Sequence, residues 1–533
     1  MSGSVILTSY LPTYPPTHLP IYPSTHLPTY PSTHLPTYPP THLPIYPSTH
    51  LPTYPSTHLP IYPSTHLPTY LSTTPSFLLP PYNKEVETDC ENLIQAETLE
   101  LLEWSRLCQH LSTFAATKLG AIAAQNLRIP AHRAETLTLL AQTREVYNLE
   151  SRASGSLSFD GIGDIGEALE RAERHGILSG QELLTIATTL AGARTLRRTI
   201  DHHPDLTVLN ELVEDLRTYP ELEQEIHHCI DDHGDVLDRA SPKLAGIREQ
   251  LKQVRDRIYS TLHSILQRKA NAIQEQVITQ RAGRFVLPVK APQKDAIPGI
   301  VHDASMSGAT LYIEPQPTVN LNNQLRQLQR QEQVEEEAVR QRLSEKVAEV
   351  KPDLERLIAI STTLDLATAR ARYSFWLGAN PPRFVEGENI VLRQLRHPLL
   401  IWQQQHEQGR EVVPIDLVIQ PHIRVVAITG PNTGGKTVTL KTLGMAALMA
   451  KVGLFVPAKE PVELPWFDQI LADIGDEQSL QQSLSTFSGH IRRISRILTE
   501  LTPSPPHPSP SSFWMKSGLE PIPQKAVPWR SRS

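Results

Sequence analysis

The sequence predicts a mostly α-helical protein with three parts: an α-helical core, an antiparallel coiled-coil lever with a small β tip, and an incomplete α/β P-loop domain. Three observations predict this fold class. Apolar residues recur at helical spacing through most of the chain between Lys84 and Glu500. A short stretch rich in β-branched residues interrupts the longest helical pattern. A strand-like run from Arg424 to Thr429 leads directly into a glycine-rich turn.

The composition limits the class of protein. The chain has 533 residues, 39% of them hydrophobic, which is enough for two or three domains. No run of about 18 apolar residues occurs, so we expect no membrane span. Cys90, Cys108 and Cys229 are scattered, which argues against a disulfide framework and predicts a cytoplasmic protein. The net charge of −6 excludes nucleic-acid binding by bulk charge and leaves only a local basic patch.

Residues 1–83 form a segment of low complexity. An octapeptide, Thr-His-Leu-Pro-(Thr/Ile)-Tyr-Pro-(Ser/Pro), recurs seven times, and the first charged residue is Lys84. Since proline removes backbone donors and forbids a helix, we expect an extended, disordered segment. A misassigned start codon is one alternative, and weak metal binding by the repeated histidines is another. These histidines are His18, His26, His34, His42, His50, His58 and His66.

Residues 84–240 are expected to form the helical core. Leu99, Leu102, Leu107 and Leu111 follow helical spacing. An apolar stripe of this kind faces other helices, so the pattern indicates packing rather than chemistry.

Residues 241–385 are predicted to contain two long helices that pair lengthwise. Ser241 followed by Pro242 is typical of a helix start. Apolar residues then recur every three or four positions, and a second such pattern runs from Leu321 to Val350. Because a non-helical insert separates the two patterns, we expect an antiparallel coiled-coil lever. The apolar residues of the first helix are Leu244, Ile247, Leu251, Val254, Ile258, Leu262 and Ile265.

The insert, about residues 268–318, is the predicted β tip. Strands are expected at residues 277–279, 284–289 and 309–313, joined through Pro298-Gly299 and residues 305–308. From residue 268 to residue 295 the tip carries six basic residues and two acidic ones, a local excess that predicts contact with a phosphate backbone. A solvated basic surface is the alternative. The predicted nucleic-acid contacts are Arg268, Lys269, Arg281, Arg284, Lys290 and Lys294.

The strongest chemical signal lies after the strand-like run 424–429. Residues 430–437 match the pattern G-x-x-x-x-G-K-[ST], and residues 438–451 have helical character, with Gly453 as a cap. Glycines let backbone N–H groups surround phosphates, Lys436 can reach the β- and γ-phosphates, and the Thr437 hydroxyl can bind Mg²⁺. We therefore predict an ATP or GTP site; an ordinary glycine turn without a ligand is the alternative. Its residues are Gly430, Pro431, Asn432, Thr433, Gly434, Gly435, Lys436 and Thr437.

Residues 502–533 are expected to be an aberrant tail. The helical pattern of apolar residues ends at a proline-rich stretch. The codons of Phe513 to Lys516, read one nucleotide earlier, must spell Leu-Asp-Glu. An aliphatic strand that ends in Asp-Glu would hold Mg²⁺ and the attacking water of an ATPase. We therefore hypothesise a frameshift between Thr502 and Ser512.

Three segments together resemble the MutS-family ATPases, most closely the second bacterial MutS type. They are the phosphate loop of residues 430–437, the segment from Asp473 to His490, and the run from Arg396 to Leu400. The resemblance covers about residues 94–501 and implies that residues 386–501 are part of an ABC-type P-loop ATPase domain. It also implies that Ser485, Thr486 and Phe487 complete the nucleotide site of a partner subunit; a helix N-cap is the alternative.

The resemblance implies a cytoplasmic, dimeric clamp that uses ATP and Mg²⁺ and has no membrane partner. Its targets would be branched or mismatched DNA, with suppression of homologous recombination, or alternatively the ribosome and its rRNA, with splitting of stalled ribosomes. As translated, the chain lacks the Walker B Asp-Glu pair and the C-terminal Smr nuclease domain of the family. Neither ATP hydrolysis nor endonuclease activity is therefore assigned, and a non-hydrolysing fragment or an inactive product of a damaged gene is a third alternative.

Overall fold

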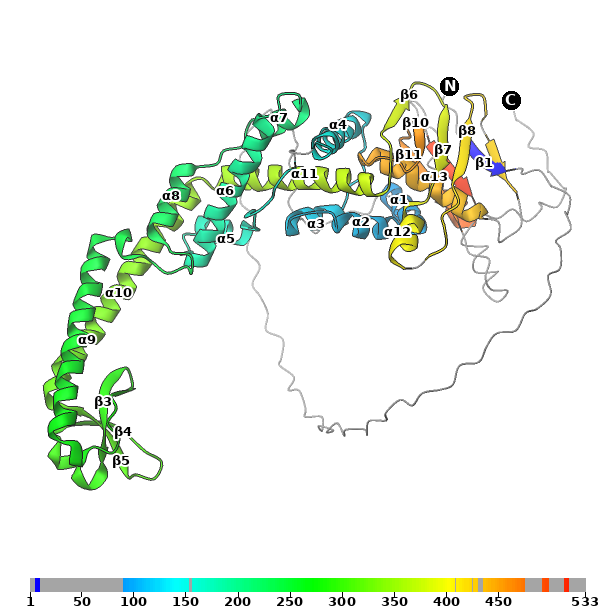
Figure 1. Ribbon diagram of the computed structural model, residues 1–533. Coiled ribbons are helices and arrows are strands. Elements are labelled where there is room, and N and C mark those ends of the chain that lie inside the picture. The colour runs from blue at the N-terminus through cyan, green and yellow to red at the C-terminus, as the bar shows by residue number, and fades with distance from the viewer. Residues whose placement is uncertain are drawn as a thin grey trace, which may run out of the picture. The chain divides into compact units, whose positions relative to one another are not determined.

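The computed structural model describes residues 5–9, 90–152, 156–407, 409–423, 425–429, 435–474, 491–497 and 512–516. Helices dominate this part of the chain, and the strands form three four-stranded sheets (Figure 1). Within it, no helix has the length and apolar character needed to cross a membrane.

The helical body comes first in the chain, as the apolar spacing predicts. Two of its helices begin at a side-chain cap: Thr117 accepts from the Gly120 N–H at the start of α3, and Ser179 forms a capping box with Glu182 at the start of α6. A later helix, α11 (Lys351–Trp376), packs against α3 and α4. The body helices are α1 (Cys90–Leu101), α2 (Trp104–Ser112), α3 (Lys118–Gln125), α4 (Arg133–Glu150), α5 (Gly166–Glu173), α6 (Gly180–Asp201), α7 (Thr207–Val213) and α8 (Pro220–Cys229).

Two long helices follow, α9 (Pro242–Arg268) and α10 (Gln316–Glu349), and they lie side by side (Figure 1). Helix α9 begins at the predicted proline, whereas α10 begins before the predicted Leu321. Their ion pairs show that the two helices run in opposite directions, because Lys243 pairs with Glu335 and Arg248 pairs with Glu332. That this pair is a coiled-coil lever stays a prediction.

The insert between α9 and α10 is an antiparallel sheet of order β2-β3-β5-β4. Three of its strands lie close to the predicted positions. Residues 299–304 were predicted as a connection and instead form the edge strand β4, which is exposed at five of its six positions. An exposed edge strand needs no apolar alternation, so its sequence pattern is weak. The strands are β2 (Thr279–Arg281), β3 (Arg284–Lys290), β4 (Gly299–Ala304) and β5 (Thr310–Pro315).

The C-terminal region contains the other two sheets. A mixed sheet has the order β6-β10-β7-β8, with helix α12 (Pro398–His406) between β7 and β8 in the chain. A parallel sheet has the order β11-β12-β1-β9. The strands of the mixed sheet are β6 (Pro382–Val385), β7 (Ile390–Leu395), β8 (Ile415–Ile419) and β10 (Lys459–Pro465). Those of the parallel sheet are β1 (Val5–Ser9), β9 (Val425–Ile428), β11 (Gln469–Asp473) and β12 (Ser512–Lys516).

Strands β1 and β12 lie in two segments where the sequence predicted no strand, and the predictions of a disordered N-terminal segment and a frameshifted tail stay predictions. Val5–Ser9 falls in the segment predicted to be disordered, and Ser512–Lys516 falls in the tail predicted to be aberrant. Both are short proline-free runs of apolar, β-branched or aromatic residues, which favour a strand beside other strands. The remainder of the octapeptide repeats and of the tail lies outside the described residues.

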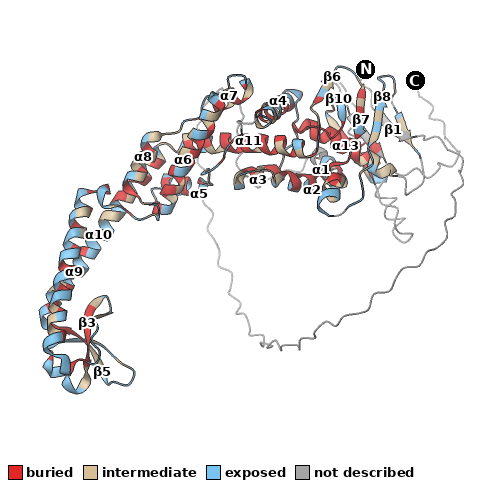
Figure 2. Cartoon of the chain, viewed as in Figure 1, coloured by how far each residue is buried: buried red, intermediate tan, exposed pale blue. Residues whose placement is uncertain are grey.

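Buried apolar side chains form separate clusters. The central cluster joins α2, α11, α13 (Lys436–Lys451) and the C-terminal strands, through residues such as Leu107, Tyr373 and Leu443. The distal cluster joins α9, α10 and the β tip; its members include Ile258 and Leu287. Figure 2 shows the contrast: α11 and α13 are mostly red, whereas α9 and α10 carry only a narrow buried stripe.

Candidate nucleotide site and nucleic-acid interface

The candidate nucleotide site begins where β9 ends. Gly435, the residue before α13, has φ +77°, a left-handed conformation that glycine adopts without strain. Lys436 and Thr437 are the first two residues of α13, which follows β9 of the parallel sheet in the chain. Anions bind at such places because helix N–H groups and the helix dipole point toward them.

The described part of the predicted nucleotide site comprises Gly435, Lys436 and Thr437. Among the described residues, no heavy atom lies within 4 Å of the position that a Cβ on Gly435 would take. The Thr439 N–H donates to the Gly435 carbonyl over 2.9 Å, which fixes the first turn of α13. Lys436 could neutralise phosphate oxygens and the Thr437 hydroxyl could bind Mg²⁺. The other predicted residues, Gly430 to Gly434, lie outside the described residues.

An ion pair ties α13 to the helical body. The Lys441 ammonium lies 2.9 Å from a carboxylate oxygen of Glu103, and the hydrogen bond from Lys441 lowers the pKa of Glu103. Glu103 immediately precedes α2 and has φ 58°, so α2 begins at a residue that this ion pair holds. A shift of α13 would therefore act on the helical body directly. The sequence pattern gave no sign of this contact.

A second polar cluster flanks the segment predicted to contain Ser485, Thr486 and Phe487, which itself lies outside the described residues. After this segment, residues 491–497 are helical. Arg496 and Arg493 both contact Glu97 of α1, at 2.8 Å and 3.4 Å. Arg493 also lies 3.0 Å from Asp473, a fully buried carboxylate at the end of β11. These contacts hold the chain on both sides of the segment.

His397, within the run from Arg396 to Leu400, has a structural role. Its imidazole is 7% exposed and accepts a hydrogen bond from the Leu399 N–H over 3.3 Å, which caps α12. Burial lowers the pKa of His397 to about 4, so the ring is neutral at pH 7. Arg396 donates to the Leu377 carbonyl at the end of α11 over 3.2 Å. The run therefore joins α12 to α11.

The six basic residues predicted to contact nucleic acid divide into two groups. Arg268, Lys269 and Lys294 are exposed, and Lys290 is half-buried and donates to the Asn271 carbonyl. The other two belong to ion pairs within the tip.

These two arginines are Arg281 and Arg284. Arg281 lies 3.1 Å from Asp303 and 4.1 Å from the centre of the Tyr312 ring. Arg284 lies 2.8 Å from Glu314. The two acidic partners follow the interval from 268 to 295 over which the sequence charge excess was counted. The exposed positive charge of the tip is therefore smaller than the sequence suggested.

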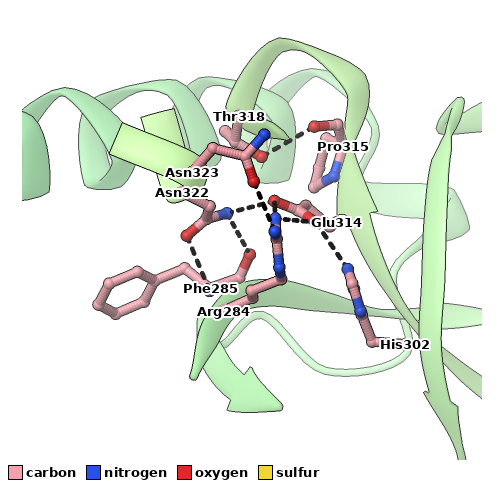
Figure 3. A network of polar contacts seen from close by, with 8 residues as sticks. All are labelled: Arg284, Phe285, His302, Glu314, Pro315, Thr318, Asn322 and Asn323. Atoms are coloured by element: carbon pink, nitrogen blue, oxygen red, sulfur yellow. Dashed lines mark hydrogen bonds and ion pairs between the residues drawn. The ribbon is translucent and has the colours of Figure 1, made fainter. Parts of the chain in front are cut away.

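Glu314 is the centre of a buried polar network at the start of α10 (Figure 3). Its side chain is fully buried and accepts hydrogen bonds from Arg284, from the Asn322 amide over 2.8 Å, and from the His302 Nε2 over 2.6 Å. Asn322 also bonds the backbone of Phe285, so the network joins β3, β4, β5 and α10. A buried charge of this kind is tolerated only when donors surround it.

Comparisons with known proteins agree with this arrangement. A family model described as MutS domain V matches residues 426–505. A protein named Endonuclease MutS2 from Synechocystis sp. is 62% identical over 418 residues, which cover 78% of this chain and 51% of that protein. Proteins of the same name from Exiguobacterium sibiricum and Shouchella clausii are 38% and 41% identical, over 76% and 75% of this chain. The chain spans about half the length of the curated relatives it matches.

A strand of a parallel sheet followed in the chain by a buried helix is typical of the class of P-loop ATPase-like proteins, and the MutS domain V match covers the end of this strand and the whole helix. The chain belongs to the MutS family, and its similarity to these relatives assigns it to the MutS2 type. The family resemblance found in its sequence motifs is thereby confirmed.

Proposed function

We propose that this chain binds Mg²⁺–ATP at residues 430–437 and the phosphate backbone of DNA at its β tip. The observation that carries the proposal is the start of α13, where a left-handed glycine is followed by a lysine and a threonine as the first two helical residues. Nucleotide occupancy would change how the tip engages DNA. Branched or mismatched DNA is the proposed target.

A continuous run of packed elements supports coupling between the two sites. Helix α13 shares the central cluster with Tyr373 and Leu377 near the end of α11. Helix α10 ends at Glu349 and α11 begins at Lys351, so the two follow each other almost without interruption. The other end of α10 is fixed to the tip through Asn322 and Glu314. A displacement at α13 could therefore reach the β tip through rigid helices.

The proposal covers binding and does not extend to hydrolysis. Strand β12, which pairs with β11, carries no Asp or Glu to hold Mg²⁺ or orient water. We further propose a homodimer in which Ser485, Thr486 and Phe487 complete the nucleotide site of the partner subunit. Light scattering with and without Mg²⁺–ATP would measure this association.

Titration with a fluorescent ATP analogue tests the nucleotide site. Lys436→Ala should weaken binding about ten-fold or more, because it removes the cation that faces the β- and γ-phosphates. Thr437→Ala should reduce the dependence of affinity on Mg²⁺. Lys459→Ala is the matched control, since it removes an exposed lysine from β10 of the same region. Equal affinity of Lys436→Ala and the wild type would overturn the proposed site.

Competition binding tests the DNA target. A four-way junction, a mismatched duplex and a perfect duplex are compared as ligands, with intact ribosomes as a separate ligand. The proposal expects the junction or the mismatch to bind most tightly and more tightly with Mg²⁺–ATP than without it. Binding to ribosomes but to none of the DNA ligands would favour the alternative of a ribosome-splitting clamp.

A further inference from the structure

A groove of about 920 Å³ lies between α9 and α10 and extends to Arg284 of the β tip. Four basic side chains line it, Lys243 from α9, Arg284 from β3, and Arg326 and Arg330 from α10, and its lining contains no acidic residue. Apart from Arg284, these residues lie outside the set that the sequence predicted to contact nucleic acid. Amide side chains such as Gln250 and Gln327 complete the polar lining.

The ion pairs of the two helices leave two of these cations without a carboxylate. Lys243 forms an ion pair with Glu335 at 2.7 Å, and Arg284 forms an ion pair with the buried Glu314. The neighbouring acidic residues of α10, Glu332 and Glu336, are bound to Arg248 on α9, outside the groove.

Arg326 and Arg330 are exposed and form no ion pair or side-chain hydrogen bond with any residue that the structure describes. The net charge of the groove is therefore close to +2, and both unmatched charges come from α10.

The spacing of these two arginines suits a nucleic-acid strand. Residues four apart lie on one face of a helix, about 6 Å apart along its axis. Because adjacent phosphates of one DNA strand have a comparable separation in space, the two guanidinium groups can each contact one of two neighbouring phosphates. Amide side chains beside them can donate to the same oxygens, as is common in backbone contacts.

Gly246 provides an independent observation. It lies inside α9 and lines the groove, and no heavy atom of the part of the chain that the structure describes lies within 4 Å of the position that its Cβ would take. The packing of this chain therefore does not require glycine there, although glycine weakens a helix. A residue without a side chain keeps this wall of the groove low, which admits the close approach of a ligand.

We infer that the groove between α9 and α10 is a second binding site for the DNA backbone, with Arg326 and Arg330 as its phosphate contacts. The inference rests on the proposed function, because it assigns a further contact surface to the same DNA ligand. The DNA held at the tip would continue along α10 rather than end at the β sheet.

Fluorescence anisotropy with a labelled duplex DNA, measured between about 50 and 200 mM salt, tests the groove. Arg326→Gln combined with Arg330→Gln should weaken binding about ten-fold and lower the slope of log affinity against log salt by about 1.8, or 0.9 for each lost contact. Arg255→Gln combined with Arg257→Gln is the matched control: it removes the same charge from exposed positions of α9 that do not line the groove. This control should leave the slope within about 0.5 of the wild type.

Gly246→Leu tests the groove without changing charge. Leucine favours helix more than glycine does, so the melting temperature should not fall, whereas the filled groove should lose affinity for DNA. Equal salt slopes for the wild type and the arginine double variant would overturn the groove and leave the proposed function intact. Absence of any DNA binding by the wild-type chain would overturn the proposed function itself. Tighter binding of a duplex RNA of the same sequence would overturn the assignment to DNA.

Discussion

His110 is a buried imidazole that must stay neutral for its site to remain intact. Its ring stacks on Trp402 with centroids 4.0 Å apart, and its Nδ1 has no hydrogen-bond partner among the described residues. Burial, with a smaller effect of Arg106 and His406, lowers the pKa of His110 from 6.5 to about 4. Between these two values the unfolded chain binds more protons than the folded chain, so stability falls as the pH decreases from 6.5 toward 4.

His110→Phe should therefore reduce acid sensitivity. Phenylalanine keeps the stacked ring and removes the titrating group, so the loss of unfolding free energy between about pH 7.5 and pH 5 should shrink by about 2 kcal/mol. Urea unfolding at the two pH values measures this difference. His397 has a similarly lowered pKa, so part of the acid sensitivity should persist in the variant. The exposed His422→Gln serves as the control, and an unchanged difference in His110→Phe would contradict the assignment.

Glu314 shows how strongly one buried charge can fix the tip. Glu314→Gln should destabilise the tip by about 3 kcal/mol, because Arg284 would be left half-buried without its counter-ion. Combining it with Arg284→Met should cost less than the sum of the two single changes, since both charges then disappear together. Hydrogen exchange of the β3 and β5 amides measures both effects. Additive costs in the double variant would show that the two side chains do not interact.

Arg284 and Glu314 also show which contacts local sequence patterns cannot predict. The charge excess counted from residue 268 to residue 295 included Arg284 as if its side chain were an exposed, unpaired cation. Its partner Glu314 lies 30 positions further along the chain and meets it only because β3 and β5 pair. The helix after the phosphate loop was predictable, because its pattern is local, although α13 begins at Lys436, two residues before the predicted start. A contact between distant strands leaves no such local pattern.

At the scale of elements, alanine substitution of two helical glycines is predicted to change the free energy of unfolding in opposite directions. Gly120 in α3 faces Asp365 of α11, and an added Cβ would lie 2.0 Å from its carboxylate oxygen. That carboxylate cannot move freely, because it accepts hydrogen bonds from the Ala116 and Thr117 N–H groups at 2.8 Å and 2.7 Å. Gly120→Ala should therefore cost about 1–3 kcal/mol of unfolding free energy. Gly246→Ala in α9 meets open space and should instead add about 0.5–1 kcal/mol.

Chemical denaturation of the two alanine variants checks this pair of predictions, with the wild type as reference. A fall in stability for Gly246→Ala would show that α9 is strained at that position. An unchanged stability for Gly120→Ala would show that the contact between α3 and α11 adapts more easily than its hydrogen bonds indicate.

The elements themselves were predicted unevenly. Helix α9 was found from its proline start and its apolar spacing, which are local properties of the chain. Strand β4 was missed because an exposed edge needs no alternation of apolar and polar residues. Strands β1 and β12 were missed because a short apolar run becomes a strand only when other strands offer it an edge. Parallel pairing between residues so far apart cannot be deduced from composition.

At the scale of the whole molecule, the separate apolar clusters predict separate unfolding steps. The central cluster joins α2, α11, α13 and the C-terminal strands, whereas the distal cluster holds only α9, α10 and the tip. Elements that share a core tend to open together, and small exposed units open at lower free energy. The tip should therefore exchange its amide protons by local opening that leaves the nucleotide site folded.

Saturation with Mg²⁺–ATP tests this division. A ligand at 100 times its Kd stabilises the folded form by about 2.7 kcal/mol, but only against openings that destroy its site. Protected amides of α13 and α11 should therefore exchange more slowly by about that free energy, whereas the Phe285 and Val289 amides in the tip should not change. Hydrogen exchange with mass spectrometry measures both regions at once, and Lys436→Ala removes the effect if the ligand acts at α13. Equal slowing of amide exchange in the tip would show that the two clusters unfold as one unit. A movement of the whole tip could not explain such slowing, because it would leave the hydrogen bonds inside the tip unchanged.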